Sequence, residues 1–189
     1  KPPLYHLQWT GGPRWSRHHD VMSSFSACVS AGGRLFYVFD EGTTYSPMMP
    51  AKWKLICRDA FNGTILWKVD IPKWFPTMHN LKSGPSHLPR RLVATEDRVY
   101  ITLSIEGQVS VLNSRTGERL SEIEGSEGAE EIVMEDDFLY LICDKTEKKP
   151  ELQRYPYSKT THAIRPKQIL KVEKSNLEIL WEYEASWTA

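Results

Sequence analysis

The sequence predicts an all-β fold made of three repeated units, each with four short antiparallel strands. Two observations lead to this prediction. Short apolar or β-branched runs recur along the chain between tight polar turns, and no window shows the 3.6-residue period of an amphipathic helix. The runs also follow one another in the same order three times: two runs joined by a small turn, a loop of variable length, and a hairpin.

In the first unit the predicted strands are 25–30, 34–39, 54–58 and 64–69. The turn Ala31-Gly32-Gly33 joins the first two, and Asn62-Gly63 closes the hairpin between the last two. Glycine suits such turns because it adopts positive φ without steric cost.

The other two units repeat this order in register. The predicted strands are 91–95, 98–103, 109–113 and 118–123 in the second unit, and 131–134, 138–143, 168–173 and 178–183 in the third. An aromatic residue stands at the same place in each second strand. An Asp, Asn or Glu precedes each hairpin turn, and the corresponding last turn residue always follows four positions later. These residues are Phe36, Tyr100 and Tyr140; Asp59, Asn113 and Glu173; and, four positions later, Gly63, Gly117 and Leu177.

The composition is that of an ordinary folded domain. The chain has 189 residues, 24 basic and 24 acidic side chains, 40% hydrophobic residues and no apolar run of the roughly 18 residues that a membrane-spanning helix needs. The zero formal charge gives no indication of a nucleic-acid or anionic-membrane partner. The chain begins with Lys1 and has no apolar signal region, so we expect a processed or excised segment.

Three cysteines lie far apart, each within an apolar run: Cys28, Cys57 and Cys143. An odd number with no C-x-x-C spacing fits neither a disulfide framework nor a zinc site. We expect all three to be small buried core residues.

Four antiparallel strands repeated radially are typical of β-propeller blades. Residues 57–67, which read CRDAFNGTILW, resemble the tryptophan-docking repeat A-x-D-x-x-T-G-x-x-x-W of propellers related to pyrroloquinoline quinone (PQQ) dehydrogenases. Asp59, Gly63 and Trp67 match this pattern, whereas Cys57 replaces its Ala and Asn62 its Thr.

The later copies are less complete, and the resemblance spans residues 25–184. The second copy has Ser121 in place of the Trp, and the third keeps only Trp181, with Glu173 as an acidic stand-in. Residues 12–20 also resemble a segment of bacterial, planctomycete-type PQQ-like repeat proteins. The resemblance implies a structural docking role for Asp59, Gly63, Trp67, Asn113, Gly117 and Trp181, because an indole at the end of an outer strand can cover the neighbouring sheet.

The predicted fold is therefore a partial β-propeller of about three blades. Propellers close with four to eight blades, so the remaining blades must come from the same protein or from a partner chain. The predicted organisation is a lead-in at 1–24, blade 1 at 25–69, an inter-blade loop at 70–90, blade 2 at 91–124, blade 3 at 125–184 with an internal loop at 144–167, and a tail at 185–189.

All the long loops fall at one end of the predicted blades, opposite the tight hairpins. Functional residues are often carried on long loops held by a rigid scaffold. Guanidinium groups bind carboxylate or phosphate, and aromatic rings stack on planar ligands, so this end could bind anions, sugars or quinones; the alternative is a blade-capping network of satisfied hydrogen bonds. The ligand-binding candidates are Arg14, Trp15, Arg17, His18, Asp20, Trp74, His79, Arg90 and Arg91.

Two further features of the sequence do not lead us to predict a functional site. His18 and Asp20 could face one way in an extended segment, but we predict no metal site from them. Residues 118–137 hold nine acids and one base, and residues 145–174 hold nine bases and three acids; such runs are usually solvated surface, although they could contact each other or a missing blade.

The favoured functional hypothesis is a non-catalytic part of a PQQ-like propeller that acts as a scaffold or recognition module. The alternatives are an arc of a quinoprotein oxidoreductase, with PQQ and calcium as cofactors, and the propeller portion of a larger enzyme. The sequence contains no adjacent cysteine pair and no G-x-S-x-G or H-E-x-x-H motif, so no catalytic residue is assigned. A periplasmic or extracellular location is implied by the resemblance alone.

Overall fold

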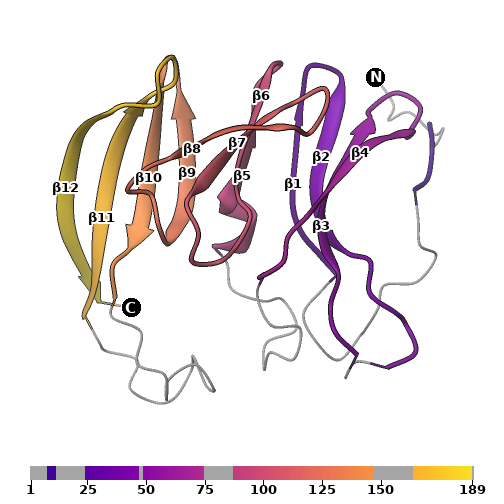
Figure 1. Cartoon of the computed structure of the whole chain (residues 1–189), viewed down its shortest axis with the longest axis horizontal. Helices are drawn as coiled ribbons and strands as arrows, with labels where there is room; N and C mark the ends of the chain where they lie inside the picture. The colour runs from indigo at the N-terminus through magenta and orange to yellow at the C-terminus, as the bar shows by residue number, and fades with distance from the viewer. Residues whose placement is uncertain (1–7, 12–23, 47–48, 75–86, 147–163, 189) are drawn as a thin grey trace, which may run out of the picture.

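The chain folds into three four-stranded antiparallel sheets in a computed structural model that describes residues 8–11, 24–46, 49–74, 87–146 and 164–188 (Figure 1). Each sheet is formed by four consecutive strands in the order in which they occur in the chain. The prediction of an all-β partial propeller with three blades is confirmed. The strands of blade 1 are β1 (Phe25–Ala31), β2 (Arg34–Asp40), β3 (Trp53–Asp59) and β4 (Ile65–Asp70).

Blades 2 and 3 repeat this meander, and their strands occupy the predicted segments to within a few residues. Blade 2 consists of β5 (Leu92–Ala94), β6 (Arg98–Thr102), β7 (Val109–Asn113) and β8 (Arg119–Ile123), preceded by the short 3-10 helix η1 (Leu88–Arg91). Blade 3 consists of β9 (Ala129–Glu135), β10 (Phe138–Asp144), β11 (Ile164–Glu173) and β12 (Ile179–Thr188). The last two strands have ten residues each and extend beyond the predicted hairpin.

The three sheets stand side by side as consecutive blades of one arc (Figure 1). The first strands lie nearest to one another, because β1 contacts β5 and β5 contacts β9. Strands β2, β4, β8 and β10 end, and β3, β5, β9 and β11 begin, at one end of the blades, which we call the long-loop end; the tight hairpins lie at the other (Figure 1).

Two apolar cores fill the spaces between the blades. Phe36, Leu55 and Trp67 of blade 1 pack with blade 2 in the first core, and Leu139 and Leu170 of blade 3 pack with blade 2 in the second. Blade 2 is covered on both faces, so four consecutive residues of β6 and four of β7 are buried. In β10 burial alternates with every residue, because among the described residues only one face of blade 3 has a neighbouring sheet.

The prediction of three buried cysteines is wrong for one of them. Cys57 and Cys143 are buried, but Cys28 is exposed. Cys28 pairs with Tyr37 on the face of blade 1 that points away from blade 2. The prediction treated this strand as one apolar run, but its residues alternate: Ala27, Val29 and Ala31 face the first core, whereas Cys28 and Ser30 lie on the other face.

Across the described residues, no helix has the length and apolar character needed to cross a membrane.

Candidate functional site

The outer hairpin of each blade ends in the same five-residue turn. The amide of the fifth residue donates to the carbonyl of the first: Gly63 to Asp59, Gly117 to Asn113 and Leu177 to Glu173, at 2.8 to 2.9 Å. The fifth residue has positive φ in each turn, 75° for both glycines and 65° for the leucine.

The side chains of the first turn residues hold two of these turns closed. The Oδ1 atom of Asp59 accepts hydrogen bonds from the Phe61 and Asn62 amides, and that of Asn113 accepts from Arg115 and Thr116. Asn62 replaces the Thr of the repeat pattern without loss, because its Oδ1 accepts from the amide two residues later, as the Thr116 hydroxyl does.

Blade 1 is joined to blade 2 by the indole of Trp67, in a contact that we call joint 1–2. Its Nε1 donates to the carbonyl of Ser114 at 3.0 Å, and its ring lies against Gly117 so closely that a Cβ at that position would be 2.7 Å from the ring. Trp67 is only 9% exposed. The indole therefore requires two features of the next blade: a backbone carbonyl that accepts its hydrogen bond, and a residue without a side chain under its ring.

Trp9 makes the same contact with the turn of blade 1. Its Nε1 donates to the Ala60 carbonyl at 2.9 Å, and a Cβ on Gly63 would be 2.6 Å from its ring. The sequence analysis placed Trp9 only in the lead-in. The signal that could have identified it is spacing, since Trp9 precedes Gly63 by 54 residues and Trp67 precedes Gly117 by 50.

Blade 2 is joined to blade 3 differently, in a contact that we call joint 2–3. Ser121 stands where blade 1 has Trp67, and the fifth turn residue of blade 3 is Leu177, which packs against the second core. The carbonyl of Lys174, equivalent to that of Ser114, accepts a hydrogen bond of 2.6 Å from the Arg98 guanidinium. Joint 2–3 thus keeps the backbone carbonyl as acceptor, but the donor is an arginine instead of a tryptophan, and a leucine fills the space that the indole would occupy.

A cluster of charged side chains lies at the long-loop end of joint 2–3. The Lys167 ammonium contacts the carboxylates of Glu130 and Asp144, the latter at 3.4 Å. Asp144 ends β10 and Lys167 is its partner on β11, so this ion pair holds together the two stems of the loop between them. Arg91, 2% exposed, donates from Nη1 to the Ile105 carbonyl at 2.9 Å.

Burial controls the protonation of this cluster. It lowers the pKa of Arg91 to about 10, and together with the positive charge of Arg91 it lowers the pKa of His87 to about 4. Burial opposes ionisation of Asp144, but hydrogen bonds from Thr146 and the charge of Lys167 lower its pKa. At neutral pH Arg91 is therefore charged, Asp144 is ionised and the imidazole of His87 is neutral.

The predicted ligand-binding residues that the structure describes are Trp74, Arg90 and Arg91. Trp74 is buried in the first core and donates from Nε1 to the Ser26 hydroxyl at 3.2 Å. Arg90 is exposed and pairs with Glu131 at 2.9 Å. The remaining candidates lie outside the described residues: Arg14, Trp15, Arg17, His18, Asp20 and His79.

The sequence analysis missed Glu130, Asp144 and Lys167 as a group. The signal was available, since Asp144 and Lys167 flank the longest loop of blade 3 as ends of adjacent strands. Their charges were instead interpreted as parts of two solvated runs.

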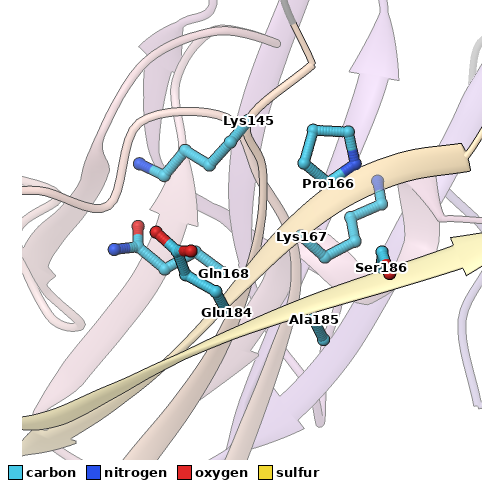
Figure 2. A pocket seen from close by; sticks show the side chains of 7 residues that line it. All are labelled: Lys145, Pro166, Lys167, Gln168, Glu184, Ala185 and Ser186. Atoms are coloured by element: carbon cyan, nitrogen blue, oxygen red, sulfur yellow. The ribbon is translucent and has the colours of Figure 1, made fainter.

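A hollow of about 520 Å³ lies beside this cluster, at the long-loop end of blade 3 (Figure 2). In Figure 2 the polar ends of Lys145, Gln168 and Glu184 lie on one side of it, and the Lys167 ammonium lies beside Pro166. Lys145 donates to the Gly125 carbonyl at 3.3 Å, and Gln168 donates to Glu182 at 2.8 Å.

Other chemical groups in the described part of the chain offer little reactivity. Burial raises the pKa of the Cys57 and Cys143 thiols to about 11, so both are protonated at neutral pH. No group of three or more His, Cys, Asp or Glu among the described residues is placed to hold a metal ion.

The chain resembles known proteins in its structure but not in its sequence. No protein-family model matches the chain, and no curated protein sequence matches it. Among solved structures, the chain is similar to acylaminoacyl peptidase of Pyrococcus horikoshii, with 9% identity and a TM-score of 0.55 over 88% of this chain and 25% of the peptidase.

Two other similar structures have lower TM-scores, and no conclusion rests on them. BamB from Moraxella catarrhalis is 13% identical with a TM-score of 0.45, covering 88% of this chain and 42% of BamB. The quinohemoprotein alcohol dehydrogenase of Comamonas testosteroni is 11% identical with a TM-score of 0.48, covering 90% and 22%. This chain thus spans about a quarter of the peptidase, and the likeness to the peptidase shows the fold alone.

Proposed function

We propose that the chain is a non-catalytic arc of a PQQ-like repeat β-propeller that acts as a scaffold or recognition module. The observation that carries this proposal is the state of the charged cluster at joint 2–3. Lys167 pairs with Glu130 and Asp144, and Arg91 is bound to a backbone carbonyl. The first contact lies within blade 3 and the second within blade 2, while the Arg90–Glu131 ion pair links the two blades. Among the described residues the cluster thus uses its carboxylates and ammonium group for structural contacts, which supports a role in holding the arc together.

Recognition would use the long-loop end. There Arg90, with 57% of its side chain exposed, presents a guanidinium that pairs with the carboxylate of Glu131. Trp74 and Arg91 lie beneath this surface and would support it from the core. Arg14, Trp15, Arg17, His18, Asp20 and His79 remain proposed contributors to the same surface, in a protein located in the periplasm or outside the cell as the sequence resemblance implies.

Calcium, which the resemblance allows as a cofactor together with PQQ, does not fit the described residues of the charged cluster. Calcium requires several oxygen ligands, yet Glu130 and Asp144 are both engaged by Lys167. We therefore derive no redox step.

A calorimetric titration of the chain with PQQ and calcium, coupled to a dye-linked alcohol oxidation assay, tests the proposal. The same titration should be made on any longer polypeptide that contains the chain. We expect no saturable binding and no turnover. Binding with turnover by a longer polypeptide would refute the scaffold function and favour the quinoprotein alternative.

The likeness to a quarter of a peptidase supports a second candidate, in which this arc is the propeller portion of a larger enzyme. The sequence that flanks the arc in the intact protein distinguishes the two, because a catalytic domain there would carry its own nucleophile or cofactor motif. Hydrolysis of acylated peptide substrates by the intact protein, lost when that domain is removed, would favour this candidate.

A further inference from the structure

Strand β12 is the outer edge of blade 3, and within the described part of the chain it pairs only with β11. It has ten residues, whereas β4 and β8, the outer strands of blades 1 and 2, have six and five. An edge strand presents a row of backbone N–H and C=O groups with which another extended chain can pair. Among the outer strands of the three blades, β12 therefore offers the longest such row.

The charged side chains of β12 differ from those of the other two outer strands. In β4 and β8 they form ion pairs within their own blade, and these pairs are Lys68–Glu41, Lys54–Asp70 and Arg119–Glu122. The carboxylates of Glu182 and Glu184 in β12 have no cationic partner among the described residues, and Glu182 accepts only the neutral amide of Gln168. The edge of blade 3 thus carries two carboxylates that await a cation.

The second of these carboxylates lies at the hollow at the long-loop end of blade 3. Glu184 is the cross-strand partner of Gln168, so their side chains share a face, and both line the hollow of about 520 Å³ (Figure 2). Gln168 donates from Nε2 to Glu182 at 2.8 Å, which identifies Oε1 as the other end of the amide. That Oε1 is buried and accepts no hydrogen bond from the described residues. The wall of the hollow therefore places an acceptor without a donor beside a carboxylate without a cation.

The two lysines that line the hollow contact other acceptors. Lys167 pairs with Glu130 and Asp144, and Lys145 donates to the Gly125 carbonyl at 3.3 Å. Pairing of the β12 carboxylates is thus left to a cation that comes from outside the described residues.

We propose that β12 binds an extended segment of a partner protein as a fifth strand, with an arginine of that segment opposite Glu184. Paired residues on adjacent strands point to the same face, so the arginine side chain enters the hollow. Its planar guanidinium has enough donors for both the Glu184 carboxylate and the Gln168 Oε1. A second basic residue, two positions along the segment, lies opposite Glu182. The proposal rests on the recognition function and specifies its partner as an extended chain with basic residues at alternate positions.

Charge favours this partner over a second copy of the chain. Antiparallel pairing of β12 with its own copy, centred on Tyr183, would place Glu182 opposite Glu184. Centred on Glu184, it would place two copies of that residue opposite each other. Like charges directly opposite destabilise a strand pair, whereas opposite charges stabilise it.

The test is a fluorescence-anisotropy titration of the chain with two labelled peptides of equal composition. In Val-Thr-Val-Arg-Val-Arg-Val-Thr-Val both arginines point to one face, and in Val-Thr-Val-Arg-Arg-Val-Val-Thr-Val they point to opposite faces. We expect saturable binding of the first peptide and at least fivefold weaker binding of the second. Equal affinities, or no saturable binding of the first peptide by the folded chain, would overturn the proposal.

Two variants of the chain locate the binding site on blade 3. Glu184→Gln should weaken binding of the first peptide at least threefold. Glu135→Gln is the matched control, because it removes an exposed carboxylate from β9, at the opposite edge of the same sheet, and should leave the affinity unchanged. Equal losses in the two variants would show that the peptide responds only to net charge, which would overturn the proposal.

Amide hydrogen exchange measured by NMR tests the added strand directly. With saturating peptide, alternate amides of β12 should exchange at least tenfold more slowly, while amides of β8 keep their rates. Protection at another strand in place of β12 would overturn the proposal, and so would a concentration-dependent dimer of the chain that protects the same amides without peptide. None of these readouts involves a cofactor, so their failure is distinguishable from failure of the scaffold function in the PQQ and calcium titration.

Discussion

Joint 1–2 and joint 2–3 connect similar sheets through the same backbone acceptor but with different side chains. At joint 1–2 the indole of Trp67 bonds to the Ser114 carbonyl and covers Gly117. At joint 2–3 the guanidinium of Arg98 bonds to the equivalent Lys174 carbonyl, and Leu177 supplies the apolar contact that an indole would have made. The comparison teaches that the earlier blade supplies the donor at both joints, whereas the apolar group comes from the earlier blade at joint 1–2 and from the later blade at joint 2–3.

Removal of the indole should give the largest effect. Trp67→Ala should lower the free energy of unfolding by about 3 to 5 kcal/mol, since it opens a cavity in the first core and leaves the Ser114 carbonyl with only the weak Cys57 thiol donor. Trp181→Ala, at an exposed position in the same strand register, should cost about 1 kcal/mol or less. Urea unfolding of the two variants measures this difference, and equal losses would show that Trp67 does not join the blades.

A methyl group under the indole should have the next largest effect. Gly117→Ala places a Cβ 2.7 Å from the Trp67 ring and should cost about 2 to 4 kcal/mol, from overpacking added to the strain of positive φ. Gly33→Ala is the matched control, because φ there is 72° and no atom lies within 4 Å of the added Cβ. It should lose only the strain, about 1 kcal/mol. Thermal unfolding that fails to separate the two variants would contradict the close contact.

Joint 2–3 should be weakened by loss of its donor. Arg98→Met leaves the Lys174 carbonyl without the guanidinium and should cost about 1 to 2 kcal/mol. Arg115→Met, which removes an exposed arginine with only long-range partners at 3.8 to 4.0 Å, should stay within about 0.5 kcal/mol of the unmodified chain. Chemical denaturation compares them, and a neutral Arg98→Met would assign this joint to Leu177 and the apolar core.

The smallest effect should appear as a pH dependence confined to joint 2–3. The pKa of His87 is lowered to about 4, so the unfolded chain binds the proton more tightly than the folded chain. The stability that this imidazole contributes is complete above its unfolded pKa of about 6.5 and is lost as the pH falls toward 4. The nearby charges have opposed effects, since Arg91 and Lys167 favour the neutral ring and Glu130 and Asp144 favour the cation.

Thermal unfolding between pH 7 and pH 4.5 measures this dependence. His87→Gln should remove on the order of 1 kcal/mol of the loss seen at pH 5. Trp67→Ala is the control, because it should retain the His87 dependence while lowering stability at every pH. An unchanged pH profile in His87→Gln would place the imidazole outside the charged cluster.

The sequence was sufficient to predict the twelve strands and their grouping, because each strand buries apolar side chains and two of the three outer hairpins use a turn that local chemistry specifies. Asp59 with Gly63, and Asn113 with Gly117, are such local signals. The turn at Leu177 was found only by its spacing, since a leucine at positive φ carries no turn signal of its own.

Contacts between distant segments could not be predicted in the same way. The exposure of Cys28 depends on which blade face has a neighbour, and the binding of Trp9 to the turn of blade 1 depends on a residue about fifty positions away. The cluster of Glu130, Asp144 and Lys167 forms because a long loop returns the chain to the next strand. Pairing across such distances is set by the stacked arrangement of the blades and not by local preference.

The acceptor at both joints, and at the Trp9 contact, is a peptide carbonyl. No amino-acid substitution at Ala60, Ser114 or Lys174 can remove that oxygen, so the acceptor of each of these contacts persists through any point mutation. A newly duplicated blade would already carry this carbonyl acceptor, and a suitable donor on the preceding blade would be enough to bind it. Such an arrangement lets an array lengthen by copying a single unit, with the fit between neighbours refined afterwards through one side chain at a time.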